Sequence, residues 1–160
     1  MKQFVVHPIG EIRVKDGEMA IVVDKKYIPA LQGIEGFGHL SILWWFSELD
    51  NEEARSYLEM PAPYKNAPEV MGIFATRGPV RPNPIALTTV KVLHIDHENG
   101  VITIPYIGAN DGSPVLDIKP DTPSIDRIEK PGVPAWCANW PASYETSGDF
   151  DWSEVFLFEA

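Results

Sequence analysis

Short runs of β-branched and aromatic residues, each closed by glycine, proline, asparagine or aspartate, constrain this chain more than any other feature. The runs cover residues 10–14, 18–23, 39–46, 71–76, 87–96 and 101–107. Runs of this length between turn-forming residues are typical of strands in an antiparallel sheet or barrel. We therefore predict a mainly β fold: a small antiparallel β-barrel with short peripheral helices and an irregular C-terminal tail.

The clearest local turn signal is the dipeptide Asn99-Gly100 between the last two runs. Both residues tolerate positive φ, so the dipeptide predicts a two-residue turn that joins these runs into a hairpin. Pro105 lies in the second run and has no N–H to donate to a neighbouring strand. We expect that strand to lie at a sheet edge or to contain a bulge.

One helix is predicted, over residues 50–59, where Asp50 or Asn51 can cap a first turn that contains two glutamates. After residue 130 the chain is rich in proline, tryptophan and acidic residues and shows no periodicity. We predict one domain organised as a β-barrel over residues 1–130 and a Trp-rich acidic tail, residues 131–160, packed on it.

Composition limits the function classes. The 160 residues contain 13 Lys and Arg against 23 Asp and Glu, a net charge of −10, and residues 131–160 contain no basic side chain. Non-specific nucleic-acid binding requires clustered basic residues, so a polyanion would have to approach the middle of the chain. Cys137 is the single cysteine, which excludes an internal disulfide. No apolar run is long enough to span a membrane and no secretory signal is present, so we expect a cytoplasmic protein without a membrane partner.

Several weaker motifs are interpreted as structural. Gly33, Gly36 and Gly38 reverse the spacing of a dinucleotide-binding loop, and we interpret them as a turn. His94 and His97 stand near the hairpin turn, where their rings should face opposite sides, so no metal site is expected. No Gly-x-Ser-x-Gly motif supports covalent catalysis.

Residues 72–87 form a different kind of segment, in which an apolar run enters a loop stiffened by three prolines. The loop carries Arg77, Arg81 and Asn83. Two guanidinium groups on a stiff loop lose little entropy when they bind an anion. This segment predicts a binding site for carboxylate or phosphate.

Residues 110–120 form a second stiffened segment, with Gly112, Pro114 and Pro120 between polar groups. Such a loop can present backbone and carboxylate oxygens to a ligand. An alternative interpretation is structural: Arg77 or Arg81 forms a salt bridge with Asp111 or Asp117 between the two loops.

The two segments resemble the hallmark motifs of the TsaA-like, or tRNA methyltransferase O-like, family. Residues 75–85 read Ala-Thr-Arg-Gly-Pro-Val-Arg-Pro-Asn-Pro-Ile, and residues 111–120 read Asp-Gly-Ser-Pro-Val-Leu-Asp-Ile-Lys-Pro. A weaker match lies at residues 31–40, and together the resemblance covers about residues 7–126. It implies a small β-barrel that binds S-adenosylmethionine near a homodimer interface. The family includes an enzyme that methylates N6-threonylcarbamoyl-adenosine in tRNA.

The resemblance also implies site residues. Motif positions place the cofactor near Arg77, Leu87 and the turn formed by Asp111, Gly112, Ser113 and Pro114. We expect Arg81, Asn83 and Lys119 to contact substrate. Methyl transfer from a sulfonium depends mainly on holding the reacting atoms in line about 3–3.5 Å apart. A weak general base suffices for an amide-like or amine acceptor, and Asp117 or Asp111 are the candidates.

The sequence departs from the family pattern in two places. The family's Pro-Arg-Gln-Pro-like loop after the first strand has no counterpart in residues 11–18, and Ser47 and Glu48 replace the usual His-Gln-like pair. Bacterial members that modify tRNA continue into a second domain for RNA, so a full tRNA footprint is hard to place on this chain of 160 residues with a net charge of −10. Methylation of a small metabolite and non-catalytic binding of S-adenosylmethionine or an anion are therefore kept as alternatives. Trp136 and Trp140 either close over a planar substrate or simply pack the tail.

Overall fold

The fold is described from a computed structural model, in which residues 1–157 are placed. Nine strands are found in these residues and all their pairings are antiparallel. They are β1 (Gly10–Lys15), β2 (Glu18–Val23), β3 (His39–Trp45), β4 (Glu59–Pro61), β5 (Val70–Gly72), β6 (Ile85–Lys91), β7 (His94–Asp96), β8 (Val101–Ile104) and β9 (Pro114–Pro120). The prediction of a mainly β, antiparallel fold is confirmed.

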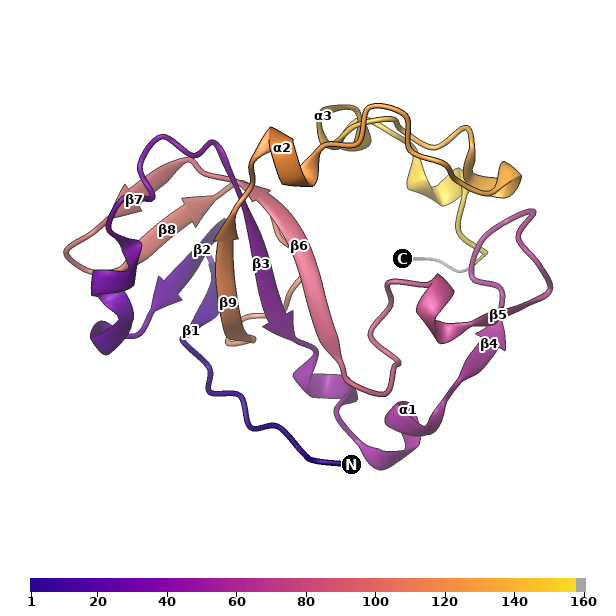
Figure 1. The fold of residues 1–160 in the computed structure, drawn as a ribbon, viewed down its shortest axis with the longest axis horizontal. Coiled ribbons are helices and arrows are strands. Elements are labelled where there is room, and N and C mark those ends of the chain that lie inside the picture. The colour runs from indigo at the N-terminus through magenta and orange to yellow at the C-terminus, as the bar shows by residue number, and fades with distance from the viewer. Residues whose placement is uncertain (158–160) are drawn as a thin grey trace.

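Seven strands form one curved sheet in the order β6-β3-β9-β1-β2-β8-β7 (Figure 1). Its two edge strands, β6 and β7, are consecutive in the chain. The backbone N–H of Val92 donates to Gly38 O at 2.9 Å, and that of Leu93 donates to Thr103 O at 2.9 Å. The segment that we predicted as a single strand over 87–96 therefore bends at Val92–Leu93 and changes partners. One bent segment thus supplies both edge strands of the curved sheet, which wraps around the core without a pairing between β6 and β7.

The core fills the inside of this sheet. Alternate residues of β3 point inward, so Leu40, Ile42 and Trp44 are buried while their neighbours on the strand are not. This alternation is the period of two that a strand with one buried face requires. The other buried apolar residues of this core come from β1, β2, β6, β8, β9, the Lys25–Leu31 turn and the segment after β8: Ile12, Ile21, Val23, Leu31, Ala86, Val90, Ile102, Ile104, Ile107 and Val115.

The helices are short and lie outside the sheet. They are α1 (Glu52–Ser56), α2 (Pro123–Asp126) and α3 (Tyr144–Ser147), with 3-10 turns at Lys25–Leu31, Ser47–Leu49, Ile73–Ala75, Ala135–Cys137 and Trp152–Glu154. Asn51 caps α1, since its side chain accepts from the N–H of Ala54 at 2.8 Å. The helix predicted over 50–59 is shorter because the chain turns extended at Tyr57. None of the helices in residues 1–157 has the length and apolarity needed to cross a bilayer.

The hairpin predicted at Asn99-Gly100 exists, but its loop is longer than expected. Asp96 pairs with Val101, which leaves four residues between β7 and β8. The carboxylate of Asp96 accepts from the backbone N–H groups of Glu98 and Asn99 and from the Asn99 side chain. An Asp side chain closes the loop in place of a two-residue turn. The second strand ends at Ile104, so Pro105 follows the ladder and does not interrupt it.

A second, two-stranded sheet stands apart from the barrel. It consists of β4 and β5, paired from Glu59↔Gly72 to Pro61↔Val70. The strand prediction over 71–76 is wrong after Gly72. The strand ends at Gly72, and a 3-10 turn follows that the Thr76 hydroxyl closes by donating to Ile73 O at 2.8 Å. We call residues 57–76, which contain this sheet, the arm.

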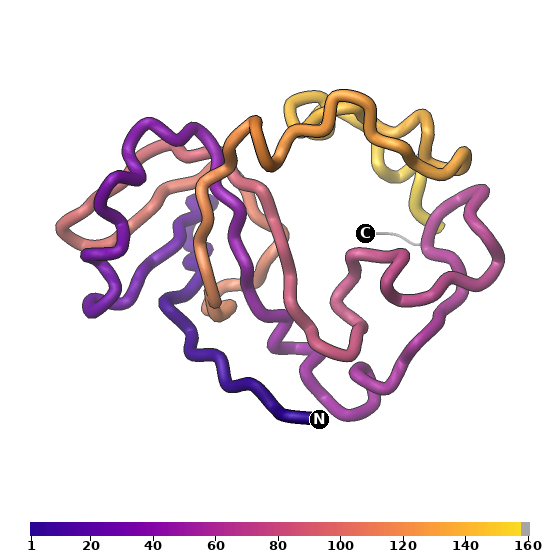
Figure 2. The backbone as a smooth tube through the Cα atoms, viewed as in Figure 1, coloured from indigo at the N-terminus to yellow at the C-terminus, as the bar shows by residue number. Residues whose placement is uncertain are grey.

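The C-terminal segment links the barrel to the arm (Figure 2). It leaves the barrel beside β3, where the N–H of Asp121 donates to His39 O at 3.1 Å and the ring of Tyr144 lies 5.1 Å from that of His39. It reaches the arm near residue 155. The division into units 1–130 and 131–160 stays a prediction, and residues 158–160 of that tail lie outside the described residues.

Candidate functional site

The loop between the arm and β6 is closed by Arg77. Its Nη2 donates to the backbone oxygen of Leu87 at 2.8 Å, which joins the two ends of the first motif. Both side chains remain exposed. Arginine carries five N–H donors, so one bond to a carbonyl leaves most of the guanidinium available to an anion. The structure thus brings together two of the residues predicted to bind cofactor.

Arg81 lies inside the same loop. Its Nη1 donates to Thr76 O at 3.1 Å and to Gly78 O at 3.0 Å. These bonds fix the loop's backbone, which is a structural use of a side chain that we predicted to contact substrate. The substrate role stays a prediction.

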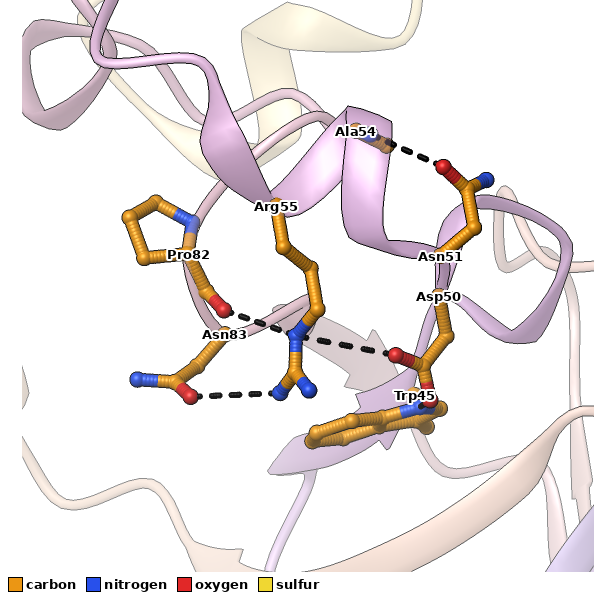
Figure 3. Close-up of polar contacts among 7 residues, drawn as sticks. All are labelled: Trp45, Asp50, Asn51, Ala54, Arg55, Pro82 and Asn83. Atoms are coloured by element: carbon orange, nitrogen blue, oxygen red, sulfur yellow. Dashed lines mark hydrogen bonds and ion pairs between the residues drawn. The ribbon is translucent and has the colours of Figure 1, made fainter.

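Asn83 belongs to a network that sequence reasoning missed (Figure 3). Arg55 of α1 donates from Nε to Pro82 O at 2.8 Å and from Nη2 to Asn83 Oδ1 at 3.3 Å. Arg55 Nε also lies 3.6 Å from Asp50 Oδ1, and its guanidinium carbon lies 5.8 Å from the ring centre of Trp45. Trp45 in turn donates from Nε1 to Asp50 Oδ2 at 3.1 Å.

This network connects α1 to the first motif across a separation of 27 residues. Arg55 uses one lone pair of the Asn83 oxygen, so the Asn83 amide keeps a second lone pair and its two N–H donors. Nothing in the sequence indicates that Arg55 contacts this loop. A basic residue near the end of a short helix is equally consistent with a side chain that only faces solvent.

The second motif begins with a turn docked on β1. Asp111 Oδ1 accepts from the N–H of Val14 at 2.8 Å, and the N–H of Gly112 donates to Ile12 O at 2.7 Å. Gly112 has φ +79°, a conformation that favours glycine. Ser113 is buried, and its hydroxyl donates to Asn110 O at 2.7 Å. Pro114 then starts β9 opposite Glu11 of β1, where its missing N–H is not needed for the turn.

The two motifs meet at one cavity of about 530 Å³. Pro79 of the first motif and the Asn110–Ser113 turn of the second line it. Trp44 and Phe46 form its aromatic wall, with ring centres 4.6 Å apart. Ser47, Glu48, Leu49 and Gly108 complete the lining. Ser47 and Glu48, which replace the family's usual polar pair, therefore lie in the wall of this cavity.

Asp117 and Lys119 lie elsewhere. Lys119 Nζ is 2.9 Å from Asp117 Oδ2, and Asp117 borders a separate crevice of about 290 Å³ with Tyr27, Phe37 and Ile118. The two cavities share no lining residue. The reason is a β-bulge in β9: Leu43 pairs with Asp117 and Trp44 with Val115, so Leu116 has no opposite residue.

The loop-to-loop salt bridge considered from the sequence is not formed. Arg77 and Arg81 donate to backbone carbonyls, Asp111 accepts from a backbone N–H, and Asp117 pairs with Lys119. The two motifs are held in place separately, each by its own backbone contacts. Within residues 1–157, no group of three His, Cys, Asp or Glu side chains is arranged to hold a metal ion.

Tyr64 of the arm is a further residue that the sequence did not indicate. Trp136 stacks on it, with ring centres 5.4 Å apart and planes 13° apart, and Trp140 meets it edge-on at 5.2 Å. In this arrangement the two tryptophans pack the tail against the arm. Burial raises the pKa of the Tyr64 phenol, while the charge of Arg77 and a hydrogen bond from the Arg77 backbone oppose that rise.

Known proteins resemble this chain over the barrel. An S-adenosyl-L-methionine-binding protein of Archaeoglobus fulgidus is 33% identical over 118 residues, which cover 74% of this chain and 79% of that protein. The tRNA (adenine(37)-N6)-methyltransferase of Escherichia coli is 34% identical over 121 residues, 74% of this chain but 51% of the enzyme. The crystal structure of TrmO from Pseudomonas aeruginosa matches with a TM-score of 0.62 at 25% identity, over 82% of this chain and 62% of that one.

The chain thus spans about half of the E. coli enzyme and less than two thirds of the TrmO structure. The family model of the tRNA-methyltransferase O N-terminal domain matches residues 2–127, which include both motifs, the cavity and the seven-stranded sheet. This chain belongs to the family of tRNA-methyltransferase O N-terminal domains.

Proposed function

We propose that this protein is a methyltransferase that uses S-adenosylmethionine and transfers its methyl group to nitrogen. The observation that carries the proposal is the cavity at which Pro79 of the first motif meets the Asp111–Ser113 turn of the second. The names of the A. fulgidus and E. coli relatives support the cofactor and the reaction.

The residues at the cavity fit such a cofactor. Its volume lies within the range of about 300–1,000 Å³ that small-molecule sites occupy. The aromatic wall of Trp44 and Phe46 suits both a planar base and a nearby cation. Two carboxylates, Glu48 and Asp111, add negative charge at an exposed position, which favours binding of a positive sulfonium.

S-adenosylmethionine, when bound, supplies a methyl group on a positive sulfur. The chain's own task is positioning, since transfer requires the acceptor nitrogen, the methyl carbon and the sulfur in line. The Asp111–Pro114 turn is rigid because it is bonded to β1, so its backbone groups hold a fixed place beside the ligand. Arg77 and Leu87 are not among the residues that line the cavity. The motif resemblance is what supports a role for the remaining N–H groups of Arg77 in binding the carboxylate of the amino-acid part.

The structure favours Asp111 over Asp117 as the group that accepts a proton. Asp111 lines the cavity and uses one carboxylate oxygen to bind Val14, which leaves Oδ2 for the acceptor. Asp117 faces another crevice and is paired with Lys119. A general base must lie within hydrogen-bond reach of the proton that it removes.

The acceptor that we propose first is adenosine in tRNA, from the similarity to the E. coli enzyme. A small-molecule acceptor is the second candidate, because the net charge of −10 opposes the approach of a polyanion. The salt dependence of binding separates the two acceptors, because binding of tRNA should weaken steeply as the salt concentration rises.

We also propose that the protein is a homodimer. The chain exposes 11337 Å² of surface, whereas a compact monomer of 17.9 kDa exposes about 8,000 Å². Apolar side chains beside the first motif contribute to this surface: Leu87 is 52% exposed, Ile85 43% and Phe74 84%. A second copy on this face would cover them and would stand next to Arg77.

Calorimetric titration with S-adenosylmethionine and S-adenosylhomocysteine, together with light scattering, tests the proposal. We expect both compounds to bind a protein of twice the chain mass. A protein that binds neither compound would refute the cofactor assignment. A protein that binds both as a monomer would retain the cofactor assignment and refute the dimer.

A further inference from the structure

The N-terminal segment, residues 1–8, runs from β1 toward α1 outside any helix or strand (Figure 1). It makes no hydrogen bond, ion pair or ring contact with any other part of the chain that the structure describes, and the first residue that is bonded is Ile9, whose N–H donates to Val115 O at 2.8 Å. The segment is nevertheless apolar. Phe4 is 89% exposed, and Val5 and Val6 are exposed as well. Neighbouring exposed apolar side chains of this kind mark a surface that binds a partner.

This segment borders a groove of about 1140 Å³. Residues 1–6 form one wall of the groove. The other wall contains the network of Figure 3, with Trp45, Arg55 and Asn83, and Ile85 at the start of β6. The volume exceeds the range of about 300–1,000 Å³ that small molecules occupy, so the groove suits a stretch of polypeptide.

The charges on the network wall indicate which polypeptide fits. Asp50 and Glu52 line this wall, and the one basic side chain on it, Arg55, is already bonded to Pro82 O and lies 3.6 Å from the Asp50 carboxylate. An acidic wall repels phosphates and attracts a segment that carries positive charge. Residues 1–10 of this chain contain Lys2 and no acidic side chain, so the N-terminal segment itself has the matching charge.

The backbone of β6 offers a second point of attachment. β6 is an edge strand of the seven-stranded sheet, and its first residue, Ile85, lines the groove. An edge strand presents N–H and C=O groups with which an added strand can pair. Phe4, Val5 and Val6 are residues that strands favour. The segment of the same chain forms no such pairing in the described residues, since it lies on the opposite wall of the groove.

We propose that the N-terminal segment is exchanged between two copies of this chain, so that residues 2–6 of each copy fill the groove of the other along β6 and Trp45. The inference rests on the homodimer proposed above and names the segment that forms it. A twofold axis makes the exchange mutual, because each copy carries both the segment and the groove.

Two observations favour a second copy as the occupant. Ile85 belongs both to the groove and to the exposed apolar face beside the first motif, so the two surfaces are continuous. The surface that this chain exposes beyond that of a compact monomer is also larger than the about 800 Å² per partner that a stable interface buries.

Charged side chains in the segment test its docking. We expect Phe4→Asp/Val6→Asp to lower the mass measured by light scattering from twice the chain mass of 17.9 kDa to that of one chain. Circular dichroism should show that the variant retains the fold, since the segment has no contact to lose within its own chain. The matched control is Leu93→Asp, an exposed apolar residue outside the groove lining, which should leave the dimer intact. A double variant that stays dimeric would overturn the proposal.

Cross-linking tests whether the segment crosses between chains. In a Cys137→Ser background, Phe4→Cys and Ile85→Cys are co-expressed as separate chains and treated with a short bismaleimide. We expect mass spectrometry to find a covalent product that contains one chain of each variant. A dimeric protein that gives no mixed product would overturn the exchange and leave the homodimer and the cofactor assignment in place. A monomeric parent would overturn the exchange and the homodimer together, whereas loss of cofactor binding alone would leave the exchange in place.

Discussion

The guanidinium of Arg77 donates to the backbone oxygen of Leu87 at 2.8 Å, although the two residues are ten positions apart in a loop that contains three prolines. The bond closes the first motif at its base. Arg77 and Leu87 therefore form one local unit. The bond to Leu87 occupies only part of the hydrogen-bonding capacity of the Arg77 guanidinium. Cofactor affinity should therefore depend on the fork shape of the Arg77 side chain as well as on its charge.

Replacing Arg77 tests this dependence. We expect Arg77→Ala to raise the dissociation constant for S-adenosylmethionine at least tenfold. Arg77→Lys should lie between it and the parent, because lysine retains the charge but lacks the planar fork that makes two parallel bonds to a carboxylate. Calorimetric titration measures both. Affinity within threefold of the parent in Arg77→Ala would show that this residue does not bind the cofactor.

Charge gives a prediction for the acceptor. If tRNA binds, its affinity should fall steeply as salt rises, because bound counterions are released from phosphates. Fluorescence anisotropy of a labelled tRNA at increasing salt measures this. Lack of binding at about 50 mM salt would count against tRNA and favour a small acceptor.

Arg55 gives a stability prediction. Arg55→Ala removes its bonds to Pro82 O and Asn83 Oδ1 and its contact with Trp45, so the free energy of unfolding should fall by about 1–3 kcal/mol. Chemical denaturation measures the change. Arg127→Ala, at an exposed position after α2, should be neutral within about 0.5 kcal/mol. Equal effects of the two variants would show that the network in Figure 3 does not stabilise the loop.

The sequence predicted most of the sheet because β1, β2 and β3 have strongly alternating or apolar runs between clear turns. It could not predict the bend at Val92–Leu93, since β-branched residues continue through it and the bend is decided by partners on two other strands. The motifs predicted the turn at Asp111–Pro114. The motifs gave no indication of the contacts that Arg55 makes with Pro82 or that Tyr64 makes with Trp136 and Trp140. Each of these contacts joins segments that are far apart in the chain and meet only in the folded protein.

Asp96 predicts a pH effect on the hairpin. Hydrogen bonds from the Asn99 side chain and backbone lower the pKa of Asp96 below its ordinary value of 3.8. The ionised carboxylate stabilises the folded loop at neutral pH, and this contribution is lost as the pH falls through the lowered pKa. Asp96→Ala should lower the melting temperature at pH 7, with a smaller difference from the parent near pH 2. Asp149→Ala, at an exposed site, should show no such pH-dependent difference.

Gly10 predicts a severe steric effect at the junction of β1, β2 and β9. A Cβ at this position would lie 2.1 Å from the backbone oxygen of Val22, and the contact is with main chain that cannot rotate away. Gly10→Ala must therefore push β1 away from β2 where the two strands begin to pair, which also shifts the strand that supports the Asp111 turn. We expect a loss of several kcal/mol, of the order of 3, in the free energy of unfolding. Gly132→Ala meets no atom within 4 Å and should leave stability unchanged, so equal stability of both variants would contradict this packing.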